Sequence, residues 1–239
     1  MSVHIIYYKD GAKMMRPVLN RAEYLALRNS GEQLHYVAAI RQGDESVKQR
    51  LVQMNYSCLP NEDGSLKGSK TAANTVGMDI DHIPEGQLQT VRESILAKRE
   101  ELGLLMLELS ARGGGYHLVF KRRPELSQEE NLRWASDLLG VDYDKGAKDI
   151  TRVFFTTTAD EKDLIWLDDE IFKDSPPALP IREGAVTCQE EISTTQTHSA
   201  PSLTGRAGGE SSSGGWVFFI LQRHPLLHNH CGMVSQDRR

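Results

Sequence analysis

The order of apolar runs between residues 76 and 158 constrains the fold more than any other feature of the sequence. The run "VGMDIDH" alternates with a period of two, which is typical of a strand. Two further short runs enclose a glycine-rich turn, which indicates a hairpin, and a run rich in β-branched and aromatic residues comes last. The four expected strands are residues 76–82, 104–110, 116–120 and 151–158.

Two helices are expected between these strands. In the first, residues 88, 91, 95 and 102 are apolar and form a stripe with helical spacing, which starts after Pro84 and stops at Gly103. In the second, Ser127 is an N-cap with Glu130 three residues later, a capping box, and Gly140 ends the helix.

The resulting order is strand, helix, strand, strand, helix, strand. This order predicts an α+β fold with a ferredoxin-like or RRM-like split βαβ core (βαββαβ). In such a core the first and third strands lie side by side and the fourth flanks the first. The helices cover one face of the sheet, and we expect the other face to be open.

The flanking regions predict an extension and a tail. Residues 1–75 contain a strand candidate at 3–8 and helix candidates at 21–29 and 47–54, which indicate an N-terminal αβ extension of the same domain. From residue 174 the chain is rich in proline, serine, threonine and glycine, which is typical of a linker or disordered tail. The division is therefore a domain at 1–173 and a low-complexity tail at 174–239.

Composition limits the classes of function. The net charge is −5, so any binding site for a polyanion must be local. No apolar run has the length of a membrane span, and three cysteines at unrelated spacings make no disulfide framework. These features predict a soluble cytoplasmic protein without a membrane partner. In the tail, the spacing of His224, His228, His230 and Cys231 matches no standard zinc site.

Asp79 and Asp81 are the first candidates for chemistry. The period of two places both carboxylates on the same side of the strand, away from Val76, Met78 and Ile80. Two like charges at this spacing are either solvated by water or neutralised by a cation between them. Mg²⁺ and Mn²⁺ prefer carboxylate oxygens, so the pair is a candidate metal site.

His117 is the second candidate. In "SARGGGYHLVF" it alternates with Tyr116 and Leu118, which places it on the same sheet face as the two aspartates. The preceding glycines offer backbone N–H groups and Arg112 offers a cation, a combination suited to phosphate. A plain hairpin turn would also use these glycines.

The segment "DYDKGAKDITR" is the third candidate. It supplies Asp142, Asp144 and Asp149 before the last expected strand, and Arg152 at the start of that strand. An acidic connecting loop would have the same composition. A third carboxylate beside Asp79 and Asp81 would complete the set that two-metal phosphoryl transfer requires.

Together, "MDID", "GGYH" and "YDKGAKDITR" resemble the three motifs of the archaeo-eukaryotic primase (primase-polymerase) superfamily. The similarity covers roughly residues 35–160 and is greatest to the bacterial branch that carries a VirE N-terminal domain, often found in mobile elements. It implies that residues 1–173 are a primase-polymerase-like catalytic domain. The expected activity is DNA-templated nucleotidyl transfer that makes primers during replication of a mobile element or plasmid.

The resemblance also implies roles for individual residues. Asp79, Asp81 and Asp144 would hold Mg²⁺ or Mn²⁺, with Asp149 as the runner-up for the third acid. Arg112, His117 and Arg152 would bind the nucleotide. Lys48 and either Lys67 or Lys70 would contact nucleic acid or nucleotide. The implied partners are nucleoside triphosphates, a single-stranded DNA template, and a helicase or helical primase domain in trans, in the bacterial cytoplasm.

Two alternatives stay open at this point. A metal-dependent nuclease or rolling-circle initiator would use the same core, but such initiators need a His-hydrophobe-His pair and "GGYHLVF" contains one histidine. A non-catalytic RRM-like nucleic-acid-binding module would hold single strands by stacking, which calls for exposed aromatic residues on the central strands. The expected face carries acids instead, which favours the enzyme.

Overall fold

The structure, a computed structural model, describes residues 3–173. It is an α+β fold with two antiparallel four-stranded sheets, as the sequence predicts for the fold class. We refer to the sheet with strand order β2-β1-β3-β7 as the N-terminal sheet and to the sheet with order β4-β6-β5-β8 as the central sheet. The tail at 174–239, including its histidines, lies outside the described residues.

The central sheet contains the predicted split βαβ core. The first and third expected strands, β4 and β6, are neighbours, and β5 pairs with the other edge of β6. Both pairings are antiparallel, as this topology requires. The strands are β4 (Thr75–Ile80), β5 (Leu104–Leu109), β6 (Tyr116–Lys121) and β8 (Leu164–Leu167).

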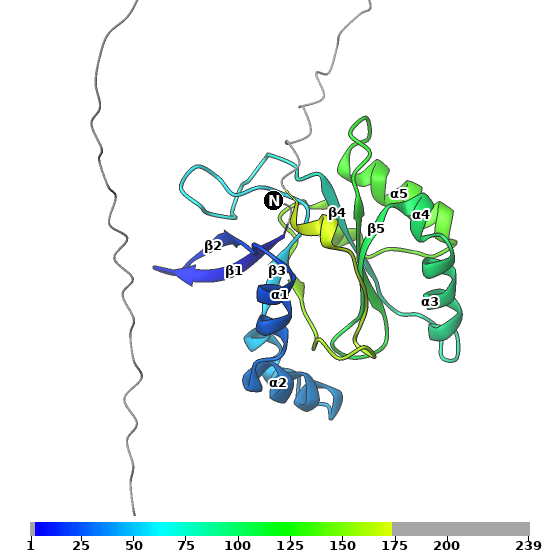
Figure 1. The fold of residues 1–239 in the computed structure, drawn as a ribbon, viewed down its shortest axis with the longest axis horizontal. Coiled ribbons are helices and arrows are strands. Elements are labelled where there is room, and N and C mark those ends of the chain that lie inside the picture. The colour runs from blue at the N-terminus through cyan, green and yellow to red at the C-terminus, as the bar shows by residue number, and fades with distance from the viewer. Residues whose placement is uncertain (1–2, 174–239) are drawn as a thin grey trace, which may run out of the picture. The chain divides into compact units, whose positions relative to one another are not determined.

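Helices cover one face of the central sheet (Figure 1). Val76, Met78 and Ile80 of β4 are buried in one apolar cluster with Ile95 and Leu132 of these helices. The helices are α3 (Leu88–Ala97), α4 (Arg99–Leu102) and α5 (Gln128–Leu139).

The helix ends follow the sequence signals closely. Ser127 and Glu130 form the expected capping box of α5, and Gly103 and Gly140 end their helices in the left-handed conformation. The stretch expected as one helix up to residue 102 is divided at Lys98 into α3 and α4.

The N-terminal region forms an αβ layer of its own, as predicted, and supplies most of the N-terminal sheet. The expected helix at 47–54 is wrong, because this segment is a short 3₁₀ helix followed by a strand. The elements are β1 (His4–Lys9), β2 (Ala12–Pro17), α1 (Arg21–Arg28), α2 (Gly31–Arg41), η1 (Glu45–Arg50) and β3 (Gln53–Asn55). Later parts of the chain add η2 (Lys145–Lys148), β7 (Phe154–Phe155) and η3 (Asp169–Phe172).

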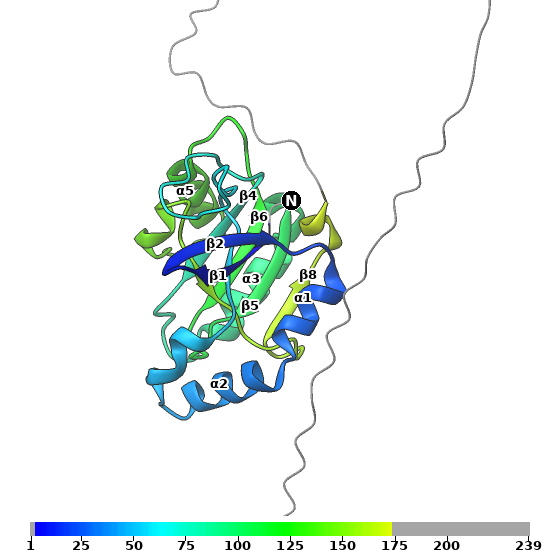
Figure 2. The same cartoon turned by 90° about the vertical axis from the view of Figure 1, so that its left-hand side faces the viewer.

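The second face of the central sheet is covered, and the expectation of an open face is wrong. Met54 and Tyr56 of the N-terminal layer are buried in one cluster with Met106 and Val119 of the central sheet. The views in Figures 1 and 2 both place the N-terminal layer over this face. Apolar side chains on both faces of β5 and β6 explain the cover, since leaving them in water would cost free energy.

The last expected strand is shorter than predicted and lies elsewhere. Only Phe154–Phe155 is extended, and β7 pairs with β3 of the N-terminal sheet instead of flanking β4. Gly77 of β4 explains how the two sheets approach here, since a Cβ at this position would lie 2.7 Å from the ring of Phe154. The edge position on the far side of the central sheet is taken by β8, a strand that was not predicted from the sequence.

Within residues 3–173, none of the helices has both the length and the apolar character that a bilayer crossing requires.

Candidate metal and triphosphate site

The predicted acid pair lies at the end of β4. Asp79 is buried and Asp81, immediately after the strand, is exposed. The alternation that buries Met78 and Ile80 under the helices directs both carboxylates to the opposite side. The pairing of the two carboxylates predicted from the period of two is therefore present in the structure.

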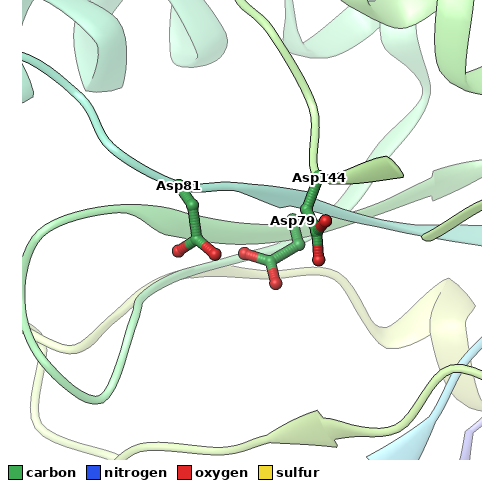
Figure 3. A group of neighbouring side chains, drawn as sticks. All are labelled: Asp79, Asp81 and Asp144. Carbon is green, nitrogen blue, oxygen red and sulfur yellow. The ribbon is translucent and has the colours of Figure 1, made fainter. Parts of the chain in front are cut away.

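Asp144 is the third carboxylate of this group. One oxygen from each of Asp79, Asp81 and Asp144 lies within 4.8 Å of the others. Figure 3 shows the three carboxylates on the same side of β4. Asp149, the runner-up, is not in the group, and its carboxylate instead accepts hydrogen bonds from the backbone and hydroxyl of Thr151.

The backbone places Asp144 beside the pair. Its N–H donates to the carbonyl of Asp79 at 2.8 Å. This hydrogen bond attaches the loop after α5 to the edge of β4 that does not pair with β6. The Asp144 carboxylate then caps η2 by accepting from the N–H of Gly146. These local bonds fix the third acid without the full edge strand that the sequence predicted.

The electrostatics of the group fit a divalent cation. Burial raises the pKa of Asp79, and the neighbouring Asp81 raises it further, while His117 and Arg152 act in the opposite direction. The buried Oδ1 of Asp79 accepts no hydrogen bond from the described residues. A buried carboxylate oxygen without a donor is costly unless a cation binds it. Three hard oxygen donors match the preference of Mg²⁺ and Mn²⁺.

Arg152 partly neutralises the acids. Its Nη2 donates to Asp144 Oδ2 at 2.6 Å and lies 3.3 Å from Asp79 Oδ2. Its guanidinium therefore contacts two of the three carboxylates of the group. Arg152, expected to bind the nucleotide, contacts the acids and also lines the adjoining cavity.

A cavity of about 370 Å³ opens next to the acids. Its lining combines Asp79 and Asp81 with a histidine and a set of cations. The cations are Lys13, Lys48, Arg112 and Arg152. The predicted residues Lys48, Arg112, His117 and Arg152 therefore come together, whereas Lys67 and Lys70 do not line this cavity. Acids beside several cations suit an anion that arrives with a metal ion, such as a triphosphate.

Arg112 lies on the glycine-rich turn between β5 and β6. Its guanidinium forms two hydrogen bonds with the carboxylate of Glu45, at 2.6 and 2.8 Å, which raises the pKa of Arg112. Both side chains are exposed, so the pair contributes little to stability and a phosphate can replace Glu45 as the partner.

Gly115 lets this turn approach the acid pair. A Cβ at residue 115 would lie 2.2 Å from the carbonyl oxygen of Ile80, a distance that no side chain tolerates. Gly115, two residues before His117, therefore has a steric role in the close approach of β6 to the end of β4.

His117 lies between two acids of the neighbouring strands. The strand register pairs it with Asp79 on β4 and with Glu108 on β5. Its Nδ1 is 3.0 Å from Glu108 Oε1 and its Nε2 is 3.6 Å from Asp79 Oδ1. Burial lowers the pKa of His117, but the two carboxylates outweigh burial and raise it overall. Glu108 thus directs Nε2 of the ring towards the acids and the cavity.

His117 is also connected through Glu108 to a buried polar network that was not predicted from the sequence. Glu108 Oε2 accepts from Arg28 Nη1 at 2.5 Å, and both side chains are fully buried. Burial alone would raise the pKa of Glu108, but Arg28 and His117 lower it to about 2. Arg28 also donates to Tyr24, whose hydroxyl contacts that of Tyr56.

A lone acid inside the apolar run "LLMLELS" is the sequence signal for this network. A buried carboxylate needs a cation, and that requirement predicts a partner without identifying it.

A second cavity, of about 500 Å³, also reaches Asp81 and Asp144. Apolar residues such as Ile83 and Val141 line it, and its lining contains no lysine or arginine. Of these two cavities, the first is therefore the one that places cations beside the acids.

Comparisons of the chain with models of protein families, with curated proteins and with solved structures give no match.

Proposed function

We propose that the protein is a metal-dependent nucleotidyltransferase that synthesises primers from nucleoside triphosphates on single-stranded DNA. The observation that carries this proposal is the group of three carboxylates, two of which, Asp79 and Asp81, line a cavity that also contains four cationic side chains. The cations beside the acids suit a substrate that carries several phosphate groups. The sequence motifs that resemble primase-polymerases support the same conclusion.

The residues divide the chemistry between them. Asp79, Asp81 and Asp144 would hold Mg²⁺ or Mn²⁺. Bound metal ions would supply charge that favours attack on the α-phosphate and departure of pyrophosphate. Lys48, Arg112 and Arg152 would bind the phosphate oxygens. In the reaction a 3′-oxygen forms a bond to the α-phosphorus, the bond to pyrophosphate breaks, and the hydroxyl proton is released.

His117 would orient the triphosphate. Glu108 accepts from its Nδ1 side, which leaves Nε2 directed to the acids and the cavity. With its pKa raised, the ring favours the charged form that donates to a phosphate oxygen.

A primer-synthesis assay tests the proposal. Wild-type protein is incubated with single-stranded DNA, labelled ribo- and deoxyribonucleoside triphosphates, and Mg²⁺ or Mn²⁺. We expect labelled oligomers from the wild type and none from the Asp79→Asn, Asp81→Asn double variant. Asp149→Asn is the matched control, because Asp149 is an exposed acid of the same segment outside the group, and it should retain activity.

Two results would contradict the proposal. Absence of product together with absence of metal-dependent triphosphate binding would leave the acids without the proposed role. Shortening of the DNA without nucleotide incorporation would instead identify a nuclease.

A further inference from the structure

The β1–β2 hairpin presents two exposed aromatic residues. Asp10 and Gly11 form its two-residue turn with φ values of 51° and 79°. Positive φ at both central residues is the geometry that matches the twist of paired strands, and the two strands stay paired up to the turn. Figure 2 shows it in front of the central sheet.

Tyr7 and Tyr8 are the aromatic residues in question. Their side chains are 42% and 59% exposed, and only two other large apolar residues in the described part of the chain, Leu19 and Leu34, are comparably exposed. Adjacent residues of a strand point to opposite faces, so the two tyrosines face different directions. Each is an aromatic surface with free area for a planar ligand.

Tyr8 is the tyrosine that faces the candidate site. It is directly opposite Lys13 in the hairpin register, and Lys13 lines the cationic cavity. Ile6 lies on the same face of β1 and packs near Ile150 and Val153, which flank Arg152 in sequence. The face that carries Tyr8 and Lys13 therefore adjoins the wall of the cavity.

The charges around Tyr8 suit a nucleic acid backbone. Lys13 lies opposite it on β2, and Asp10 is the single acid of the hairpin. The neighbouring segment is bonded to the hairpin through the Leu66 N–H and the Lys13 carbonyl, and it adds two exposed lysines, Lys67 and Lys70. That segment also carries the acids Glu62 and Asp63, so its net charge is small. Attraction of a phosphate backbone would therefore depend on the positions of the lysines beside the hairpin.

We propose that the face of the β1–β2 hairpin formed by Tyr8 and Lys13 binds single-stranded DNA. A base stacks on the ring of Tyr8 while Lys13 contacts an adjacent phosphate, and the strand continues towards the cavity. Aromatic rings beside cations are the combination by which proteins hold single strands without reading their sequence. The inference rests on the proposed function, for which it assigns the surface that receives the template.

Fluorescence anisotropy of a dye-labelled oligothymidylate tests this inference in the full-length chain, without metal or nucleotide. Stacking on one aromatic ring is worth roughly fivefold to a hundredfold in affinity. We expect Tyr8→Ala to weaken binding at least fivefold and Tyr8→Phe to restore it. Tyr7→Ala is the matched control, because Tyr7 is a similarly exposed tyrosine on the opposite face, and its effect should stay below about twofold. Lys13→Ala should reduce the slope of log affinity against log salt concentration by about 1, the value for one lost phosphate contact.

Equal effects of Tyr7→Ala and Tyr8→Ala, or no effect of either, would overturn the inference. So would a self-associating wild type that Tyr8→Ala renders monomeric without any change in DNA affinity, since a second copy would then occupy this face. Metal-dependent triphosphate binding, measured on the same variants, separates the two proposals. If it persists while Tyr8 has no effect on DNA, the inference alone fails. If it is absent while DNA binding depends on Tyr8, the proposed function alone fails.

Discussion

Arg152 is the residue whose present contacts and proposed role differ most. It contacts Asp79 and Asp144 in the structure, while the proposed reaction requires it on a phosphate. A metal ion that binds the acids would displace the guanidinium towards the cavity, where a triphosphate would accept it. Metal and triphosphate would then strengthen each other's binding, and such coupling is reciprocal.

Arg152→Gln should therefore change the two affinities in opposite directions. Without nucleotide, Mn²⁺ should bind the variant up to about fivefold more tightly, since a competing and partly exposed cation is lost. A metal–triphosphate complex should bind about tenfold more weakly, because one charge-assisted contact is missing. Calorimetric titrations of wild type and variant measure both, and a fall in both affinities would contradict this account of Arg152.

His4 predicts how stability depends on pH. Burial lowers its pKa from 6.5 to about 4, so the folded protein holds it neutral where the unfolded chain is protonated. The unfolded state therefore binds more protons between these two pH values. The contribution of neutral His4 to the free energy of unfolding is therefore fully present above pH 6.5, and it is lost as the pH is lowered towards 4.

At pH 5 the contribution of His4 should have fallen by roughly 2 kcal/mol relative to pH 7. Urea unfolding at both pH values checks this figure, and His4→Gln should reduce the difference between them by that amount. An unchanged pH dependence in the variant would show that another group is responsible.

At the scale of elements, the turn between β5 and β6 aligns the site. Gly115→Ala would place a methyl group against the carbonyl of Ile80, next to Asp81. We expect a loss of about 1–3 kcal/mol in the free energy of unfolding, as for other overpacked sites, and weaker metal binding. Gly114→Ala is the neighbouring control, since its Cβ would have no contact within 4 Å. Equal effects of the two variants on chemical denaturation would contradict the steric role of Gly115.

The elements that the sequence predicted are those with strong local signals. Alternation identified β4, glycines bounded β5 and β6, and the capping box located the start of α5. The β1–β2 hairpin has such a signal too, in the Asp10-Gly11 pair, although only its first strand was predicted. In contrast, β3 and β7 are very short, and their pairing depends on residues about a hundred positions apart.

The site divides in the same way. Asp79, Asp81 and His117 were predictable because strand alternation alone places them on one face. The link from His117 through Glu108 to Arg28 was not, because Arg28 lies on a separate helix, 80 residues before Glu108. Local patterns show which face a side chain takes, but not which distant element covers that face.

At the scale of the molecule, Phe154 joins the two sheets. Its buried ring lies against Gly77, with its centroid 5.4 Å from that of His117 and 5.6 Å from that of Tyr56. Phe154→Ala should lower the free energy of unfolding by about 3–5 kcal/mol, as for other large truncations in a core. Phe155→Ala is the comparison, because Phe155 is only partly buried and should cost less. Denaturant titration compares the two, and similar losses would contradict this role of Phe154.

The central claim is that Asp79, Asp81 and Asp144 hold a divalent metal to which a triphosphate adds. Electron paramagnetic resonance of free Mn²⁺ tests it directly in wild type, Asp144→Asn and Asp149→Asn, with and without a non-hydrolysable triphosphate. The account predicts saturable binding to the wild type that the triphosphate tightens, at least about tenfold weaker binding to Asp144→Asn, and unchanged binding to Asp149→Asn. Binding of Mn²⁺ to Asp144→Asn with wild-type affinity would contradict it.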